Sequence, residues 1–225
     1  LFSKKIFTAK DIRKSFIEKY KNKIYEVGPI LDKKILNNSV IKKKDNEGKF
    51  SILILGGSQG AEIFGKIIPH VIKMLKDANY NIEVFQQCTI NQKKQLIEFY
   101  KNNNIKNYIF EFDRDILKLI ISSNIAITRC GASTTAELNQ TFTPFIAVPL
   151  PNSIDNHQYL NAKYYEDKGC CWLLEQRNLN VNNLFNLIVE TIKDKNKLKN
   201  IHNNMKKNFN NNVYKIIDKE VKEFI

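Results

Sequence analysis

Two runs of small residues in this chain have the composition of phosphate-binding turns. Residues 56–61 (Gly-Gly-Ser-Gln-Gly-Ala) follow the apolar run 51–55, and residues 129–137 (Arg-Cys-Gly-Ala-Ser-Thr-Thr-Ala-Glu) follow the apolar run 125–127. Each precedes a segment of helical pattern, so each predicts a strand, a tight turn and a helix start. A helix start presents unpaired backbone N–H groups and the positive end of the helix dipole, which suit phosphate oxygens. Because glycine also lets a bulky diphosphate approach the backbone, the pair predicts a nucleoside diphosphate cradle.

Polar side chains at the two turns are candidates to complete that cradle. In the first turn Ser58 offers a hydroxyl donor and a helix cap, with Gln59 and Gly60 directly after it. In the second, Glu137 would lie about one turn inside a helix that starts near Ser133, where a carboxylate can accept both cis-hydroxyls of a ribose. An ordinary glycine-rich turn and an ordinary first-turn glutamate are the alternative interpretations. The first turn matches neither G-x-G-x-x-G nor a Walker A loop, which counts against NAD enzymes and P-loop NTPases.

A third polar cluster follows the apolar run 145–148. Pro149-Leu150-Pro151 leads to residues 155–158 (Asp-Asn-His-Gln) and then to Asn161-Ala162. Ligands of open parallel sheets bind at the carboxyl ends of the strands, so this cluster is expected near the two turns. A hydrogen bond from Gln158 to a sugar hydroxyl is the favoured interpretation. His157 is a weaker candidate for a catalytic base, because no Ser or Cys nucleophile motif accompanies it.

Short apolar runs alternate with longer helical patterns from residue 50 onward, which is typical of βαβ units. Strands are predicted at 51–55, 82–87, 108–112, 125–128, 145–148 and 171–174, and helices near 61–77, 91–102, 115–123, 133–140 and 157–168. This alternation predicts an α/β fold with a Rossmann-like, doubly wound parallel sheet. Closing helices at 181–194, 196–209 and 213–224 are expected to pack on the sheet edge. Before residue 50 we predict strands at 4–9 and 24–27, a helix at 11–20 and a polar linker at 41–49.

The chain is strongly basic, since 36 Lys and Arg against 23 Asp and Glu give a net charge of +13. Only four of the basic residues are Arg, the better residue for bidentate recognition of phosphate or bases. A solvated lysine-rich surface is one interpretation, and attraction to anionic lipid or nucleic acid is the other. The four cysteines show no zinc-binding spacing and predict reduced thiols in a cytosolic protein, and the three histidines are too dispersed for a metal pair. No apolar run approaches the ~18 residues of a membrane span.

Together these motifs resemble the MurG family of bacterial transferases, which add GlcNAc from UDP-GlcNAc to lipid I (undecaprenyl-pyrophosphoryl-MurNAc-pentapeptide) and form lipid II. The resemblance runs from about Lys4 to the C-terminus and rests on residues 56–61, 129–137, 144–151 and 155–162, and on 112–115 (Phe-Asp-Arg-Asp). It implies the C-terminal domain of an inverting GT-B glycosyltransferase that needs neither a metal nor a cofactor. It also implies a role in peptidoglycan synthesis, and so in cell shape and division, at the cytoplasmic face of the inner membrane.

The resemblance further implies a role for each matching residue. The turn at Ser58, Gln59 and Gly60 would contact the diphosphate, the main chain at Asp113 would pair with the uracil edge, and Glu137 would hold the ribose. The remaining expected contacts, to phosphate and sugar, are Ala132, Ser133, Thr134, Thr135, Ala136, His157 and Gln158.

The chain departs from the family pattern in two respects. The family junction reads Gly-Asn-Pro-aliphatic-Arg, whereas residues 28–31 read Gly-Pro-Ile-Leu, which places Leu31 where an Arg would lie near the donor. We expect that the family's N-terminal acceptor domain, which carries the catalytic base and the membrane-docking patch, is missing from this chain. We therefore expect residues 1–40 to be its tail plus the hinge, 41–210 the UDP-GlcNAc-binding domain, and 211–225 a C-terminal helix. The chain alone is expected to be inactive, with no catalytic residue assigned.

The partners expected from the resemblance are UDP-GlcNAc, lipid I through the missing domain, and an anionic membrane surface. A second hypothesis is a non-catalytic nucleotide-sugar-binding subunit that works with a separate membrane partner, as in the eukaryotic two-subunit GlcNAc transferase of the dolichol pathway. A third, a basic nucleic-acid-binding domain, is disfavoured because the chain has few arginines and no aromatic-rich RNA-binding signature.

Overall fold

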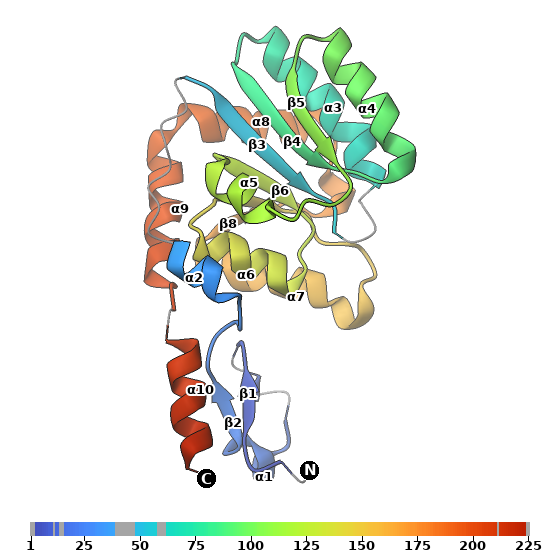
Figure 1. Ribbon diagram of the computed structural model, residues 1–225. Coiled ribbons are helices and arrows are strands. Elements are labelled where there is room, and N and C mark those ends of the chain that lie inside the picture. The colour runs from blue at the N-terminus through green and yellow to red at the C-terminus, as the bar shows by residue number, and fades with distance from the viewer. Residues whose placement is uncertain are drawn as a thin grey trace.

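The computed structural model describes residues 3–10, 12–13, 16–38, 48–57, 62–210 and 212–223. Ser58, Gln59 and Gly60 of the first predicted turn lie outside these residues, as does most of the predicted linker 41–49. Figure 1 shows a large α/β layer structure above a smaller unit that holds both described ends of the chain.

Six strands form one parallel sheet in the order β5-β4-β3-β6-β7-β8. Their bounds are β3 Phe50–Leu55, β4 Ile82–Gln87, β5 Lys106–Phe110, β6 Ile125–Thr128, β7 Phe145–Ala147 and β8 Cys171–Leu173. The chain winds outward from β3 through β4 to β5, then returns to place β6 on the other side of β3, where Leu55 pairs with Thr128. The strand order therefore reverses between β3 and β6, and a crevice at this reversal is the usual ligand site of doubly wound sheets.

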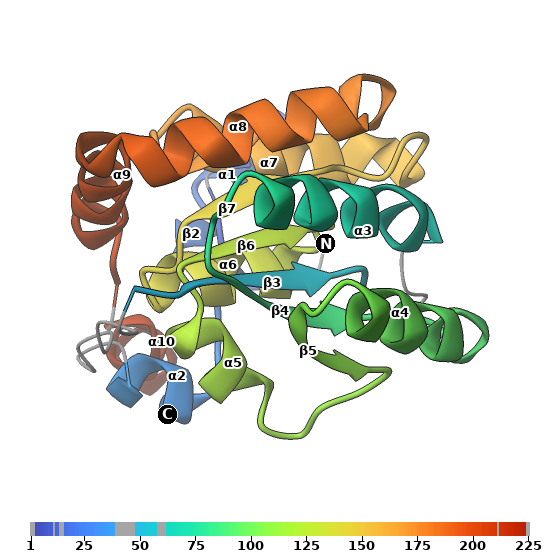
Figure 2. The ribbon, with the colours of Figure 1, turned by 90° about the horizontal axis from the view of Figure 1, so that it is seen from above.

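Helices cover both faces of this sheet (Figure 2). On one face Ile52 and Ile54 of β3 pack in a core with α3, α4 and α8, while on the other Leu53 and Leu55 pack with α5, α6, α7 and α9. The bounds are α3 Glu62–Asp77, α4 Ile90–Asn102, α5 Ile116–Ser122, α6 Ala132–Gln140, α7 His157–Glu166, α8 Val181–Lys193 and α9 Lys195–Lys207. Successive residues of a strand point to opposite faces, so a continuous apolar run buries both. This confirms the predicted fold class.

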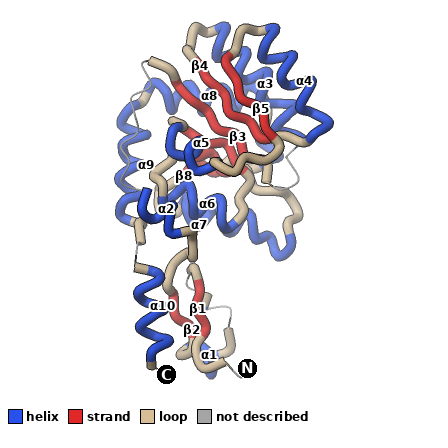
Figure 3. Tube along the Cα trace, in the orientation of Figure 1, coloured by secondary structure: helices blue, strands red, loops and turns tan. Residues whose placement is uncertain are grey.

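The smaller unit combines the two ends of the described chain (Figure 3). Its parallel pair of strands, β1 Ile6–Thr8 and β2 Ile24–Glu26, is joined through α1 Glu18–Lys21, and α2 Lys33–Asn38 follows. The C-terminal helix α10, Val213–Lys222, packs here rather than on the edge of the large sheet. Lys5 forms ion pairs with Glu220 and Glu223, and the Tyr214 hydroxyl donates to the Leu31 carbonyl at 2.7 Å.

Two expectations for the terminal segments are thus corrected. The helix predicted at 11–20 is, within the described residues, only the single α-helical turn α1, because the fifteen residues between Thr8 and Ile24 must also return the chain to pair β2 with β1. The expected position of α10 on the sheet edge is wrong because its partners, Lys5 and Leu31, come from the opposite end of the chain.

Candidate functional site

Two cavities meet at the carboxyl ends of β3 and β6, where the strand order reverses. The larger, about 880 Å³, is lined by Gly57 together with Gly131, Ser133 and Gln158, among others. The smaller, about 220 Å³, is lined by Gly57, Phe112, Asp113, Thr134 and Glu137, among others. Gly57 and Thr134 border both cavities, so one ligand with two chemically different halves can extend from one to the other.

The first turn of α6 forms the wall between the two cavities. Gly131 is its N-cap and makes no side-chain cap, which leaves backbone N–H groups at this helix start for another acceptor. Ser133 is exposed and Thr134 is half-buried, and both line the cavities. Thr135 instead is buried, and its hydroxyl donates to the Gly131 and Ala132 carbonyls at 3.0 and 3.2 Å. Its side chain serves the helix rather than the cavity surface.

The Glu137 carboxylate lies half-buried in the smaller cavity, opposite Asp113 and Phe112. Within the described part of the chain no group donates a hydrogen bond to it and no cation pairs with it. Burial raises the pKa of Glu137, because the ionised form loses water without gaining a partner. An acceptor that is partly desolvated and unpaired is suited to a ligand that brings hydroxyl donors.

The loop after β5 holds Asp113 in a fixed conformation at the rim of the smaller cavity. The Asp113 carboxylate accepts from the Asp115 backbone N–H at 2.6 Å and from the Tyr108 hydroxyl at 3.1 Å. Asp113 therefore shapes the loop with its side chain, and a ligand would meet its main chain. Beside it Phe112 is 77% exposed, an apolar ring at the mouth of the cavity.

Gln158, at the start of α7, faces the larger cavity with its amide oriented by the backbone. Its Oε1 accepts from the Cys130 N–H at 3.1 Å and the Leu150 N–H at 3.0 Å, so the side-chain amide nitrogen is left to donate. His157 is exposed, with Nδ1 2.7 Å from the Ile154 carbonyl oxygen, and it is not among the residues that line the two cavities.

Arg129 is a lining residue that the sequence reasoning did not assign. Its side chain is buried at the base of the larger cavity, where it donates to the Val148 and Pro149 carbonyls and to Gln176, and lies 5.0 Å over the Phe64 ring. The available signal was its position directly after β6, at the edge of the sheet where ligands bind.

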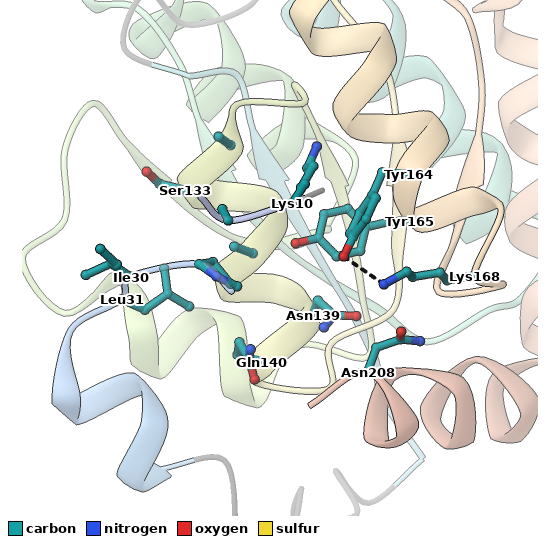
Figure 4. A pocket seen from close by; sticks show the side chains of 14 residues that line it. Lys10, Ile30, Leu31, Ser133, Asn139, Gln140, Tyr164, Tyr165, Lys168 and Asn208 are labelled. Atoms are coloured by element: carbon teal, nitrogen blue, oxygen red, sulfur yellow. Dashed lines mark hydrogen bonds between the residues drawn. The ribbon is translucent and has the colours of Figure 1, made fainter. Parts of the chain in front are cut away.

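A third cavity, about 230 Å³, shares only Ala132 and Ser133 with the larger one and contains Ala136 (Figure 4). Leu31 and Ile30 lie on one side of it, and Tyr164, Tyr165 and Lys168 lie on the other, where Lys168 donates to the Tyr164 hydroxyl at 2.7 Å. Leu31 is only 6% exposed and packs in an apolar cluster with Ile35 and Ala136. Leu31 therefore lines neither of the two cavities at the sheet edge, and its expected position near the donor stays a prediction.

In the described part of the chain no group of three or more His, Cys, Asp or Glu side chains is arranged to hold a metal ion. The four cysteines are buried free thiols, and burial raises the pKa of Cys130 to about 12. No helix among the described residues has the length and apolar character needed to span a membrane.

A doubly wound parallel sheet with cavities at its switch point defines a Rossmann-like domain. Residues 51–219 match the family described as the glycosyltransferase family 28 C-terminal domain, and the chain belongs to this family.

Its curated relatives include the UDP-N-acetylglucosamine–N-acetylmuramyl-(pentapeptide) pyrophosphoryl-undecaprenol N-acetylglucosamine transferase of Pelagibacter ubique. The chain is 36% identical to it over 194 residues, which cover 86% of this chain and 54% of the relative. The enzyme of the same name from Rickettsia canadensis is 35% identical over 208 residues, 92% of this chain and 59% of the relative. The chain thus spans somewhat more than half the length of these relatives, and the resemblance to their family is confirmed.

Solved structures show the same fold. MurG from Acinetobacter baumannii superposes with a TM-score of 0.69 at 24% identity, over 84% of this chain and 53% of that one. The C-terminal CMP-Kdo binding domain of WaaA from the same organism superposes with a TM-score of 0.54 at 8% identity, over 78% of this chain and 97% of that one. The predicted GT-B C-terminal domain fold is confirmed.

Proposed function

We propose that this chain is the donor-binding half of an inverting GT-B N-acetylglucosaminyltransferase that uses UDP-GlcNAc and converts lipid I to lipid II. The observation that carries the proposal is the pair of cavities that meet at the start of α6, one with an unpaired carboxylate and the other with helix N–H groups. The names of the curated relatives support the choice of donor and acceptor.

In this proposal the nucleoside occupies the smaller cavity. Glu137 accepts the ribose hydroxyls, the main chain at Asp113 meets the uracil edge, and Phe112 covers the base. The diphosphate lies against Gly57, the start of α6 at Ser133 and Thr134, and the turn at Ser58, Gln59 and Gly60.

The sugar extends into the larger cavity, where the Gln158 amide nitrogen donates to a GlcNAc hydroxyl. Ala132 borders this end, and Thr135 and Ala136 contribute by holding α6 in place rather than by contact. His157, fixed at the Ile154 carbonyl, is retained only as a contact at the rim.

Inverting transfer needs an acceptor hydroxyl that attacks the anomeric carbon while UDP departs, and a base that takes the hydroxyl proton. We assign the base and the acceptor groove to the part of the relatives that this chain does not match. Residues 1–40 then form the tail of that part and the hinge, residues 41–210 the donor domain, and residues 211–225 the helix that packs on the tail. The alternative hypothesis, a non-catalytic nucleotide-sugar-binding subunit with a separate partner, predicts the same donor binding. It differs only in that a separate gene encodes the partner.

We also propose a peripheral position at the cytoplasmic face of the bacterial inner membrane. Helix α9 has five lysines and no acidic residue from Lys195 to Lys207, and within the described residues only Lys197 of these is ion-paired, with Glu190. Lys195, Lys199, Lys206 and Lys207 are exposed, which favours adsorption to anionic headgroups. Sedimentation with phosphatidylglycerol vesicles, absent with phosphatidylcholine vesicles and lost in high salt, is the expected result. Equal binding to both vesicle types, or to neither, contradicts this position.

Calorimetry tests the donor site directly. The chain should bind UDP-GlcNAc and UDP, bind ADP at least tenfold more weakly, and give no product with a lipid I analogue. Product should form only when a MurG N-terminal domain is added in trans. Absence of UDP binding by the folded chain refutes the donor site, and salt-sensitive DNA binding tighter than UDP binding favours a nucleic-acid role instead. Turnover by the chain alone would show that it contains its own base, with His157 as the first candidate.

A further inference from the structure

Arg129 is a buried cation that lines the larger cavity. It is 8% exposed and lies at the carboxyl end of β6, directly before the turn that starts α6. Nη1 donates to the Val148 and Pro149 carbonyls at 3.2 and 3.1 Å, and Nη2 donates to Gln176 Oε1 at 2.5 Å. These three bonds hold the guanidinium between the ends of β6 and β7 and the segment after β8.

The charge of this guanidinium has no counter-ion. Among the described residues no ion pair joins Arg129 to an Asp or Glu carboxylate, and its three hydrogen-bond acceptors are neutral. Burial lowers the pKa of Arg129, but a guanidinium stays protonated at any physiological pH. A buried cation without an anion lowers the stability of the folded chain. Proteins retain such a residue where a ligand supplies the missing negative charge.

The guanidinium also has donors to spare. Of its five N–H groups three are used, and the Nε–H and the second Nη2–H have no acceptor among the described residues. Gly57, Gly131 and Ser133 line the same cavity, so these donors share it with the backbone N–H groups at the start of α6. Leu31 brings no charge to this cavity. The other lining cation is Lys66, whose side chain is 73% exposed at the rim next to Glu62.

We propose that Arg129 supplies the positive charge that binds the diphosphate of the donor in this chain. The inference rests on the proposed function and specifies which residue gives that site its preference for a nucleoside diphosphate over a nucleoside. The rigid guanidinium, already oriented by three hydrogen bonds, loses little conformational freedom when phosphate oxygens bind. Lys66 is solvated and flexible and contributes less.

The affinity ratio of UDP to uridine isolates the diphosphate from the nucleoside. Both ligands use the cavity of Glu137 and Asp113, and only UDP reaches Arg129. Arg129→Met should lower the UDP-to-uridine ratio about tenfold to a hundredfold and leave uridine affinity unchanged, as expected for loss of charge-assisted hydrogen bonds. Arg129→Lys should retain part of the ratio, since it keeps the charge but not the two-point geometry. Arg177→Met, which removes an exposed arginine paired with Glu175, is the matched control for net charge.

Each outcome decides the proposal. An unchanged ratio in Arg129→Met overturns it, and so does a parallel loss of UDP and uridine affinity, which identifies a purely structural clamp. If Arg129→Met does not fold, Lys66→Met decides instead, because this exposed residue can be replaced without disturbing the core. A loss of less than threefold in the ratio supports Arg129, and any larger loss overturns the proposal by assigning the charge to Lys66. Wild-type chain that binds UDP no more tightly than uridine refutes this inference alone, whereas chain that binds neither ligand refutes the proposed function.

Discussion

Replacement of Glu137 should weaken nucleotide binding and at the same time stabilise the unliganded chain. Glu137 is half-buried, lines the smaller cavity, and has no donor or cation beside it in the described residues. A carboxylate in this position is unfavourable for the free protein and becomes favourable only when a ligand offers hydroxyl donors. Glu137→Gln and Glu137→Ala separate the two effects, because Gln keeps the size and one acceptor oxygen whereas Ala keeps neither.

The expected size of the binding effect follows from the hydrogen bonds at stake. A hydrogen bond to a charged group contributes ~1.5–3 kcal/mol, so loss of the ribose contacts in Glu137→Ala should lower UDP affinity about tenfold to a hundredfold. Glu137→Gln should lose about tenfold. Without ligand the Gln variant should be more stable by up to ~1 kcal/mol, since solvent still reaches part of the carboxylate, which raises Tm by about 2–4 °C in a chain of this size.

The pH dependence of both effects has a definite sign. Burial raises the pKa of Glu137 in the folded chain, so the folded state holds this proton more tightly than the unfolded state. The contribution of Glu137 to stability is therefore fully present below the ordinary glutamate pKa, ~4.3, and is lost as pH rises through the raised value. UDP affinity should rise with pH through the same window, because the ribose binds the ionised form.

Calorimetric titration with UDP between pH 4.5 and 8, together with thermal unfolding of each variant, measures these quantities. Glu137→Gln should show a flatter dependence of UDP affinity on pH than the wild type. A folded Glu137→Ala chain with unchanged UDP affinity would refute the assignment of the ribose site. A Gln variant that is less stable than the wild type at pH 7 would show that the carboxylate has a partner in the free protein.

Three further variants test other parts of the site. Gln158→Glu keeps the hydrogen bonds from the Cys130 and Leu150 N–H groups but removes the free NH₂ donor, so the affinity for UDP-GlcNAc relative to UDP should fall about threefold to tenfold by calorimetry. An unchanged ratio would show that this nitrogen does not contact the sugar. Leu31→Arg places a charge in an apolar cluster, so it should lower the free energy of unfolding, measured by chemical denaturation, by at least ~2 kcal/mol and should not raise UDP affinity. Tighter UDP binding would show that residue 31 reaches the donor. Gly57→Ala should lower the free energy of unfolding by ~1–2 kcal/mol, because the backbone at Gly57 has a φ of +80°, which a residue with a Cβ atom disfavours. A variant as stable as the wild type would show that this turn relaxes to negative φ.

Local signals in the sequence were sufficient to predict the units of the fold. The apolar runs before residues 56 and 129 predicted β3 and β6, and the small residues after β6 predicted the start of α6, because strand pattern and glycine preference depend on near neighbours. The segment 108–112 was shifted by two residues from β5, which begins at Lys106. This edge strand tolerates a polar start because Lys106 forms an ion pair with Glu83 of β4. The sequence alone does not predict such a pair between two strands.

For the candidate site, too, local sequence predicted some of the lining residues and packing decided the others. Residue types at the turns predicted Glu137, Ser133 and Gln158 as lining residues, since each lies within a few residues of a strand end. The sequence also supported Thr135, yet the period of the α6 helix directs that side chain inward to the Gly131 carbonyl. Which side chains line a cavity depends on the rotation of the helix against its neighbours, and a one-residue difference reverses the outcome.

By itself, the sequence determined that this chain builds a doubly wound sheet with a small-residue turn at the start of α6, because turn chemistry and apolar periodicity are local properties. Only the tertiary structure decided that Arg129 is buried without a counter-ion among the described residues, that Leu31 packs away from the two cavities at the sheet edge, and that α10 pairs with residues near the other end of the chain. These are consequences of contacts between residues 19 to more than 200 positions apart, as in Arg129 with Val148 and Lys5 with Glu220. Such contacts form only once the whole chain has packed, and no local pattern encodes them.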